Sequence, residues 1–126
     1  MPPAVVNIER LRLITGDDPG LLRELIPLFL DDTAGRVERL IAALRGENWR
    51  TLAAEAHAIK GASANMGAEV LQQACAELEK LARDLQGDSS QGSLEQAEQL
   101  VQRVVRDHEE ASRFFRAHAA KLASEA

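Results

Sequence analysis

The feature that most constrains this chain is a helical repeat of apolar residues through four long segments. Apolar residues recur at spacings of three and four within Asp18–Arg45, Asn48–Met66, Leu71–Leu85 and Ser93–Phe115, which is the pattern of amphipathic helices. No segment shows the alternation with a period of two that marks a half-buried strand. Aromatic residues form only 3% of the chain, whereas strands draw on aromatic and β-branched residues. The sequence therefore predicts an all-α protein.

Helix-capping residues and glycines separate these segments. Asp18 precedes Pro19, which places an N-cap acceptor before a proline at the first helical position. Gly46 is expected to end that helix, Asn48 to cap the next one and Gly67 to form a turn. Connections this short make consecutive helices antiparallel neighbours. We therefore expect an antiparallel up-down four-helix bundle.

Two further stretches complete the predicted architecture. A short extra helix from Asn7 to Ile14 precedes the bundle, and its apolar residues Val6, Ile8, Leu11 and Ile14 are expected to pack on it. Gly87–Ser93 is the one low-complexity linker, and Ser93 with Gln96 resembles a capping box. Because the sequence contains no internal repeat and no sign of a second domain, residues 1–126 are interpreted as one domain.

Charge and composition exclude several classes of protein. The formal net charge of −5 argues against a nucleic-acid partner. The most apolar window, Leu21–Leu30, contains Arg23, Glu24 and Pro27 and is far shorter than the roughly 20 residues of a membrane span. The single cysteine, Cys75, cannot form an internal disulfide, and the first residues do not resemble a signal peptide. We therefore expect a cytoplasmic protein with no membrane segment.

Enzyme motifs that depend on a metal or a nucleotide are also missing from the sequence. There is no G-x-x-x-x-G-K-[ST] loop, no H-E-x-x-H helix and no kinase glycine-rich loop. The prediction is a protein without cofactor, metal or nucleotide site, unable to phosphorylate itself from ATP.

His57 is the exception to an otherwise ordinary bundle. The apolar stripe of its helix is centred roughly 140° away from it on a helical wheel, so the imidazole is expected to face solvent. An exposed helix face normally carries long charged side chains, but this one consists mostly of alanine and glycine. The residues predicted to share the His57 face, and to contact a partner, are Arg50, Ala53, Ala54, Lys60, Gly61 and Ala64.

Gly61 and Lys60 indicate what the His57 face does. A glycine inside a helix costs about 1 kcal/mol relative to alanine, so Gly61, one turn after His57, is expected to clear space for another protein. Lys60, three residues after His57, would place a compact positive charge beside the ring. A neutral imidazole is a nucleophile at cytoplasmic pH and also a good leaving group. The pattern therefore indicates a phosphoryl carrier, because phosphoryl transfer depends on positioning and charge neutralisation.

The segment AHAIKGASANMGAEVLQQACAELE, from Ala56 to Glu79, closely resembles the signature of histidine-containing phosphotransfer domains. The resemblance extends from Asp17 to about Arg83 and has an alanine where a serine commonly follows the motif glycine. It implies phosphorylation on Nε2 of His57, with Lys60 and Gly61 in the roles described above. Glu79 matches the position that orients the histidine in chemotaxis-kinase phosphotransfer domains, where other members often have glutamine.

The resemblance also implies the partners. These would be the receiver domains of response regulators, which exchange the phosphoryl group through an aspartate, and a sensor histidine kinase, often a hybrid one. We expect a monomer that acts as a phosphocarrier and not as an enzyme. One alternative is a degenerate bundle that binds receivers or dimerises as a scaffold; the intact His57, Lys60 and Gly61 favour the carrier. A catalytic fragment would need a second polar cluster that the sequence does not contain.

Overall fold

The computed structural model describes residues 2–87 and 93–125, and over these ranges the chain forms five α-helices and no strand. The helices are α1 (Ile8–Thr15), α2 (Pro19–Arg45), α3 (Trp49–Asn65), α4 (Glu69–Gly87) and α5 (Leu94–Glu125). The predicted all-α fold is therefore confirmed.

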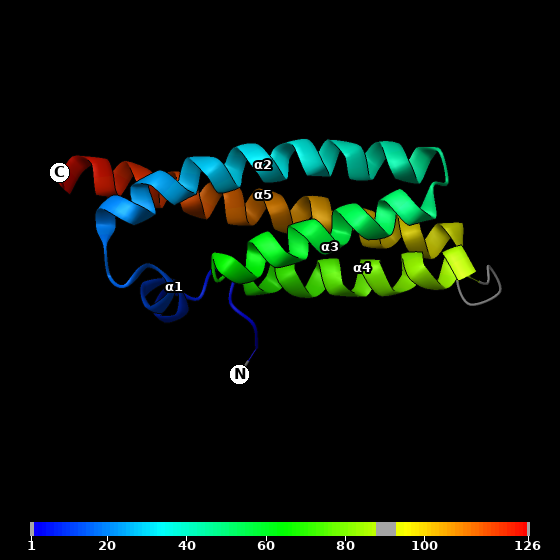
Figure 1. Cartoon of the computed structure of the whole chain (residues 1–126), viewed down its shortest axis with the longest axis horizontal. Coiled ribbons are helices and arrows are strands. Elements are labelled where there is room, and N and C mark those ends of the chain that lie inside the picture. The colour runs from blue at the N-terminus through cyan, green and yellow to red at the C-terminus, as the bar shows by residue number, and fades with distance from the viewer. Residues whose placement is uncertain (1, 88–92, 126) are drawn as a thin grey trace.

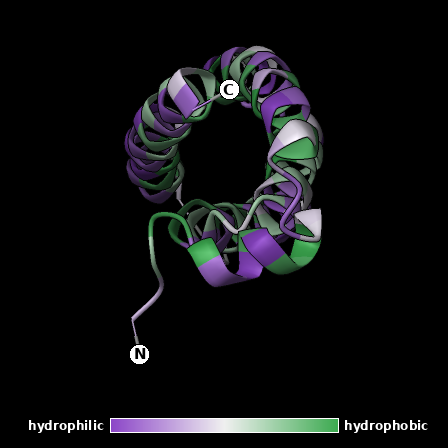
Figure 2. Ribbon diagram, turned by 90° about the vertical axis from the view of Figure 1, so that its left-hand side faces the viewer, coloured by the Kyte–Doolittle hydropathy of each residue, from purple (hydrophilic) through white to green (hydrophobic). Residues whose placement is uncertain are grey.

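The four long helices run alternately up and down around a common axis, as Figures 1 and 2 show. Helices α2 and α4 each pack against both α3 and α5, so α3 and α5 lie diagonally across the bundle. Helix α1 lies across the end of the bundle near the α3–α4 turn (Figure 1). This is the predicted up-down four-helix bundle with a short helix in front.

The helix ends follow the capping residues of the sequence. The Asp18 side chain accepts hydrogen bonds from the backbone N–H groups at the start of α2, and Asn48 accepts one from Thr51 at the start of α3. Ser93 and Gln96 form the reciprocal capping box ahead of α5. Each cap satisfies backbone donors that a first helical turn leaves free. Most of the predicted Gly87–Ser93 linker, residues 88–92, lies outside the described residues.

Gly67 connects the N-terminal segment to the α3–α4 turn. Its φ of 69° lies in the left-handed region, and a Cβ built there would stand 2.9 Å from the carbonyl oxygen of Asn7. The backbone N–H of Asn7 donates to the carbonyl of Gly67 over 2.8 Å. Only glycine allows both this turn and this close approach.

The core lies between the four long helices and extends under α1. Its largest fully buried side chains are Phe115, Ile26, Leu40, Leu52, Ile59, Leu71, Leu78 and Val104. Of the residues predicted to pack from the first helix, Leu11 is buried but Ile14 is 42% exposed, so that prediction is wrong for Ile14. Leu11 and Thr15 turn inward one helical turn apart, and Ile14 falls outside the stripe that they form. No helix within the described ranges is long and apolar enough to cross a membrane.

Candidate functional site

His57 lies in the middle of α3 with its side chain at the surface. The buried residues of α3 are Leu52, Ala53, Ala56, Ile59 and Ser63, which direct the opposite side of the helix to solvent. The His57 side chain is 62% exposed. A reacting group from another protein can therefore reach the ring without any opening of the bundle.

Glu79 of α4 holds one edge of this ring. His57 Nδ1 lies 3.0 Å from Glu79 Oε2. The Glu79 residue is only 7% exposed, which is unusual for a charged side chain. A carboxylate buried to this degree needs cations and hydrogen-bond donors around it.

Two cations supply those donors. Lys60 Nζ donates to Glu79 Oε1 over 2.6 Å. Arg83, one turn further along α4, donates from Nε over 3.0 Å and from Nη2 over 2.7 Å, both to Glu79 Oε2. Both carboxylate oxygens are therefore engaged, and Oε2 is shared between Arg83 and His57.

The charge state of Glu79 determines the tautomer of His57. Burial alone would raise the pKa of the Glu79 carboxyl, but hydrogen bonds from Lys60 and Arg83, together with the charges of Lys60 and His57, lower that pKa to about 2. Glu79 is therefore ionised at neutral pH and can only accept hydrogen bonds. A neutral His57 ring must then carry its proton on Nδ1, which leaves the lone pair on Nε2.

Gly61 is exposed one turn after His57. Apart from its chain neighbours and the backbone of its own helix, no atom of the described residues lies within 4 Å of a Cβ built at this position. Packing inside the chain therefore does not require a glycine here. The cost of glycine in a helix must have another reason, and the open space next to the imidazole is available to a second protein.

The other predicted face residues divide between surface and core. Arg50 and Ala54 are exposed, and Lys60 and Ala64 are partly buried. Ala53 is only 1% exposed, so its predicted place on the contact face is wrong. Ala53 lies two turns before Lys60, on the flank of α3 that faces α4, and the extensive packing between these two helices covers it.

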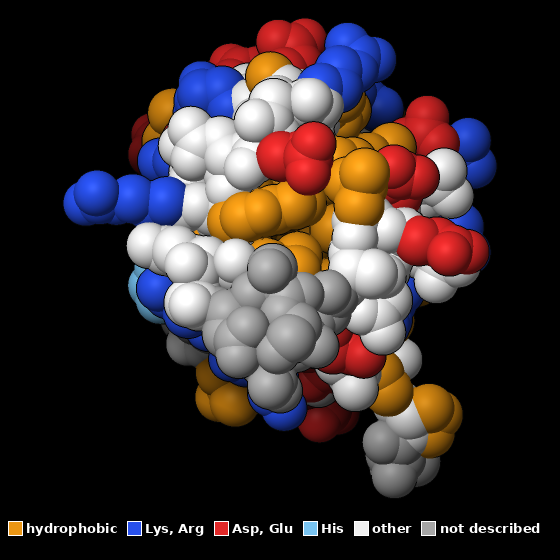
Figure 3. All heavy atoms as spheres, turned by 90° about the vertical axis from the view of Figure 1, so that its right-hand side faces the viewer, with side chains coloured by type: hydrophobic (Ala, Val, Ile, Leu, Met, Phe, Trp, Pro, Cys, Tyr) orange, Lys and Arg blue, Asp and Glu red, His pale blue; other side chains and the backbone are white. Residues whose placement is uncertain are grey.

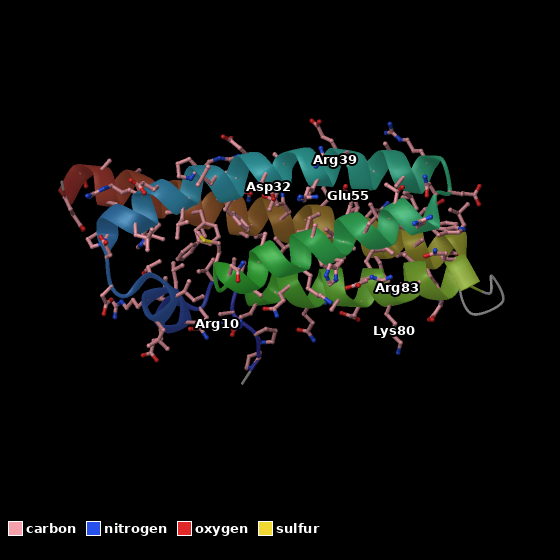
Figure 4. All side chains as sticks on the ribbon, in the orientation of Figure 1. Arg10, Asp32, Arg39, Glu55, Lys80 and Arg83 are labelled. Atoms are coloured by element: carbon pink, nitrogen blue, oxygen red, sulfur yellow. The ribbon has the colours of Figure 1, made fainter. Side chains whose placement is uncertain are left out.

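Arg83 is a site residue that the sequence had not indicated, and Glu55 is a structural carboxylate on the same helix as His57. Arg83 could have been found from its spacing, because it lies four residues after Glu79 on a helix and so shares its face. Glu55 accepts from Arg36 and Arg39 of α2, each over 3.3 Å. This carboxylate ties α3 to α2 on the flank opposite Glu79. Figure 4 shows Glu55 between α2 and α3, and Arg83 on α4.

The remaining histidines lie outside this site, and Cys75 is buried in the core one turn before Glu79 on α4. Thr33 Oγ1 lies 2.8 Å from His108 Nε2, and the His118 ring stacks on Phe114 with 5.9 Å between centroids. Cys75 is fully buried, and burial, with the nearby charge of Asp107, raises the pKa of its thiol to about 12. Within residues 2–87 and 93–125, no group of three or more His, Cys, Asp or Glu side chains is arranged to hold a metal ion.

The fold and this geometry define a helical bundle that presents one nucleophilic imidazole nitrogen to a partner. The Hpt domain model matches residues 24–107. Histidine-containing phosphotransfer protein B from Pseudomonas aeruginosa has a similar crystal structure, with 26% identity, a TM-score of 0.83, and coverage of 95% of this chain and 98% of that one. The X-ray structure of a rice protein, assigned as a histidine-containing phosphotransfer protein, shares the fold at 22% identity and a TM-score of 0.79, covering 96% of this chain and 85% of that one. No curated protein sequence matches the chain significantly.

The chain belongs to the Hpt domain family. Its function is phosphorelay histidine phosphotransfer within two-component signalling. Proteins of this family are phosphocarriers and not catalytic enzymes in the usual sense, and they interact with receiver domains and histidine kinases.

Proposed function

We propose that His57 is the phosphoacceptor of this protein and that Nε2 is the atom that carries the phosphoryl group. One observation supports this more than any other: the exposed His57 ring is held through Nδ1 by the buried Glu79 carboxylate. Nε2 is then the unprotonated nitrogen. A nucleophile held by its far edge is already oriented for attack.

The transfer step requires only the His57 ring of this chain and the aspartyl phosphate of a receiver domain. The Nε2 lone pair of His57 attacks the phosphorus of an aspartyl phosphate on a receiver domain. The Nε2–P bond forms, the P–O bond to the aspartate breaks, and the aspartate leaves as a carboxylate with the bonding electron pair. Because Nδ1 keeps its proton, the phosphorylated ring is cationic, and Glu79 at 3.0 Å stabilises that charge. The reverse step passes the phosphoryl group to the next receiver.

The surface around His57 suits such an exchange. Gly61 and Ala54 are exposed and small, and Arg50 and Ala64 border them. A receiver domain can approach the Nε2 side over this low surface. Lys60 binds Glu79 in the resting state. Because it lies three residues after His57 on the same helix, its ammonium is close enough to neutralise part of the charge of a phosphoryl group on His57.

We also propose that the whole chain acts as a single domain and a monomer. The family match covers residues 24–107, but the bundle to which they belong extends from α2 through α5. Its partners would be receiver domains and a sensor histidine kinase, often a hybrid one, in the cytoplasm, where proteins of this family typically act.

The experiment is phosphoryl transfer from phosphorylated receivers of the same organism, with label followed over seconds. We expect His57→Gln to abolish acid-labile labelling, since glutamine has no ring nitrogen to phosphorylate. His118→Gln is the matched control, because it removes a distant histidine and should label normally. Acid-labile phosphate on the His57→Gln variant would contradict the proposal and direct attention to His108 and His118.

A further inference from the structure

Arg83 makes contacts that differ in kind from those of Lys60. Lys60 reaches Glu79 from α3, so its bond crosses the seam between two helices. Arg83 lies on the same helix as Glu79, four residues further along, and places two N–H groups on one oxygen. Its hold on the carboxylate therefore does not depend on the spacing between α3 and α4.

The oxygen that Arg83 holds is the one that faces the histidine. Oε2 of Glu79 receives both Arg83 donors and lies 3.0 Å from His57 Nδ1, while Lys60 binds Oε1. A glutamate carboxylate rotates easily about its last side-chain bond. Without Arg83, the carboxylate could turn to keep its bond with Lys60 and lose the one with His57.

We propose that Arg83 is a positioning residue of the phosphotransfer site: by fixing Glu79 Oε2 it keeps the His57 proton on Nδ1 and the lone pair on Nε2. Arg83 acts through Glu79 and does not itself need to touch the phosphoryl group. The inference rests on His57 as the phosphoacceptor, but its first test requires no phosphate.

The first test is nitrogen NMR of the His57 ring in the full chain at neutral pH. We expect the wild-type ring to be protonated at Nδ1, and Arg83→Ala to raise the population of the Nε2–H form. Arg83→Lys should restore the Nδ1–H form only in part, because lysine keeps the charge but lacks the planar fork of donors. Lys80→Ala is the control: it removes one positive charge from the same helix, and Lys80 projects away from the bundle in Figure 4.

The second test measures uptake of phosphate from phosphoramidate, a small donor that needs no partner protein. In this reaction the P–N bond of the donor breaks, ammonia leaves, and a bond from phosphorus to Nε2 forms. Arg83→Ala should lower the uptake rate about fivefold, the equivalent of about 1 kcal/mol in the barrier. If Arg83 acts through Glu79, the same change should have little further effect in a Glu79→Gln background.

The outcomes separate this inference from the proposed function. An unchanged tautomer in Arg83→Ala would overturn the positioning role, whatever the labelling shows. An equal loss of rate from Arg83→Ala in wild type and in Glu79→Gln would overturn it as well, because Arg83 would then act on the phosphoryl group directly. Labelling that persists in His57→Gln would instead refute the phosphoacceptor assignment.

Discussion

Glu79 is a glutamate whose charge is stabilised in the folded protein by three neighbouring side chains. Its carboxylate is nearly buried, yet three side chains from two helices donate to it or lie within hydrogen-bond distance. Removing any one of these partners leaves a buried charge with fewer donors, which is costly. The residue therefore contributes both to the His57 geometry and to stability.

Glu79 should make the free energy of unfolding depend on pH in the acid range. The pKa of Glu79 falls from 4.5 to about 2 in the folded protein, so its stabilising contribution is present above about pH 4.5 and is lost as pH falls toward 2. By linkage, a depression of this size corresponds to about 3 kcal/mol. We expect Glu79→Gln to lose less unfolding free energy than wild type over this pH range, measured by urea denaturation. Parallel curves for the two proteins would contradict the burial and ion-pair argument.

At the scale of elements, α3 is the helix that carries His57, the proposed phosphoacceptor. Its two flanks are joined to neighbours by carboxylates, Glu55 to α2 and Glu79 to α4. Its remaining side is left open around His57 and Gly61. The helix is thus held firmly while one face stays free for a partner, which is what a carrier that exchanges phosphate with several proteins requires.

Gly61→Gln tests whether that open face is needed. Because a Cβ at Gly61 meets no atom of another element within 4 Å among the residues that the structure describes, the fold should accept the side chain, and helix propensity should add about 0.5 kcal/mol of stability. Transfer to and from receivers should nevertheless fall at least tenfold, because the glutamine occupies the approach to Nε2. Thermal melts and receiver transfer assays measure the two effects.

Ala117→Gln is a suitable control for this change, since Ala117 is exposed on α5, diagonal to α3. It should leave transfer unchanged. Near-normal transfer in Gly61→Gln would show that the clearance beside His57 is not used.

At the scale of the whole molecule, α2 and α5 form the long pair that supports α3 and α4. Phe29 of α2 meets Phe115 of α5 edge-on, with 5.1 Å between ring centroids. The buried Thr33 hydroxyl on α2 also lies 2.8 Å from His108 of α5.

An apolar groove lies between the same two helices and is lined by Ile41, Leu44, Leu94, Val101 and Val105. It is at the end of the bundle that Figure 3 faces, where hydrophobic side chains gather at the surface.

Phe115→Ala should test whether the bundle unfolds as one unit. Phe115 is fully buried, and loss of such a ring costs about 3–5 kcal/mol. Because one core joins all four long helices, the urea midpoint should fall equally whether it is followed by circular dichroism or by fluorescence of Trp49, at the far end of α3. Phe114→Ala, at a partly buried ring, should cost less. Separate midpoints for the two probes would indicate that the two ends of the bundle unfold independently.

Much of this fold follows from the sequence because its signals are local. The helical period, the caps at Asp18 and Asn48 and the turn at Gly67 each depend on neighbouring residues. The same period places His57 opposite the apolar stripe of its own helix. These features needed no knowledge of which helix lies beside which.

Only the tertiary structure decided what lies on the flanks of α3. A helical wheel gives the angle of Ala53 from His57, but not the position at which α4 begins to cover the helix, so Ala53 was misplaced. A helical wheel puts Arg83 on the same face as Glu79, and the family resemblance implied that Glu79 orients His57, but neither gave the 3.0 Å contact between Glu79 and His57 or the shared oxygen that joins Arg83 to it. The sequence by itself therefore determined the helices, their order and the exposed histidine. Packing between helices decided the geometry by which Glu79 and Arg83 hold that histidine, because such contacts depend on the rotation and offset of two helices that no local pattern records.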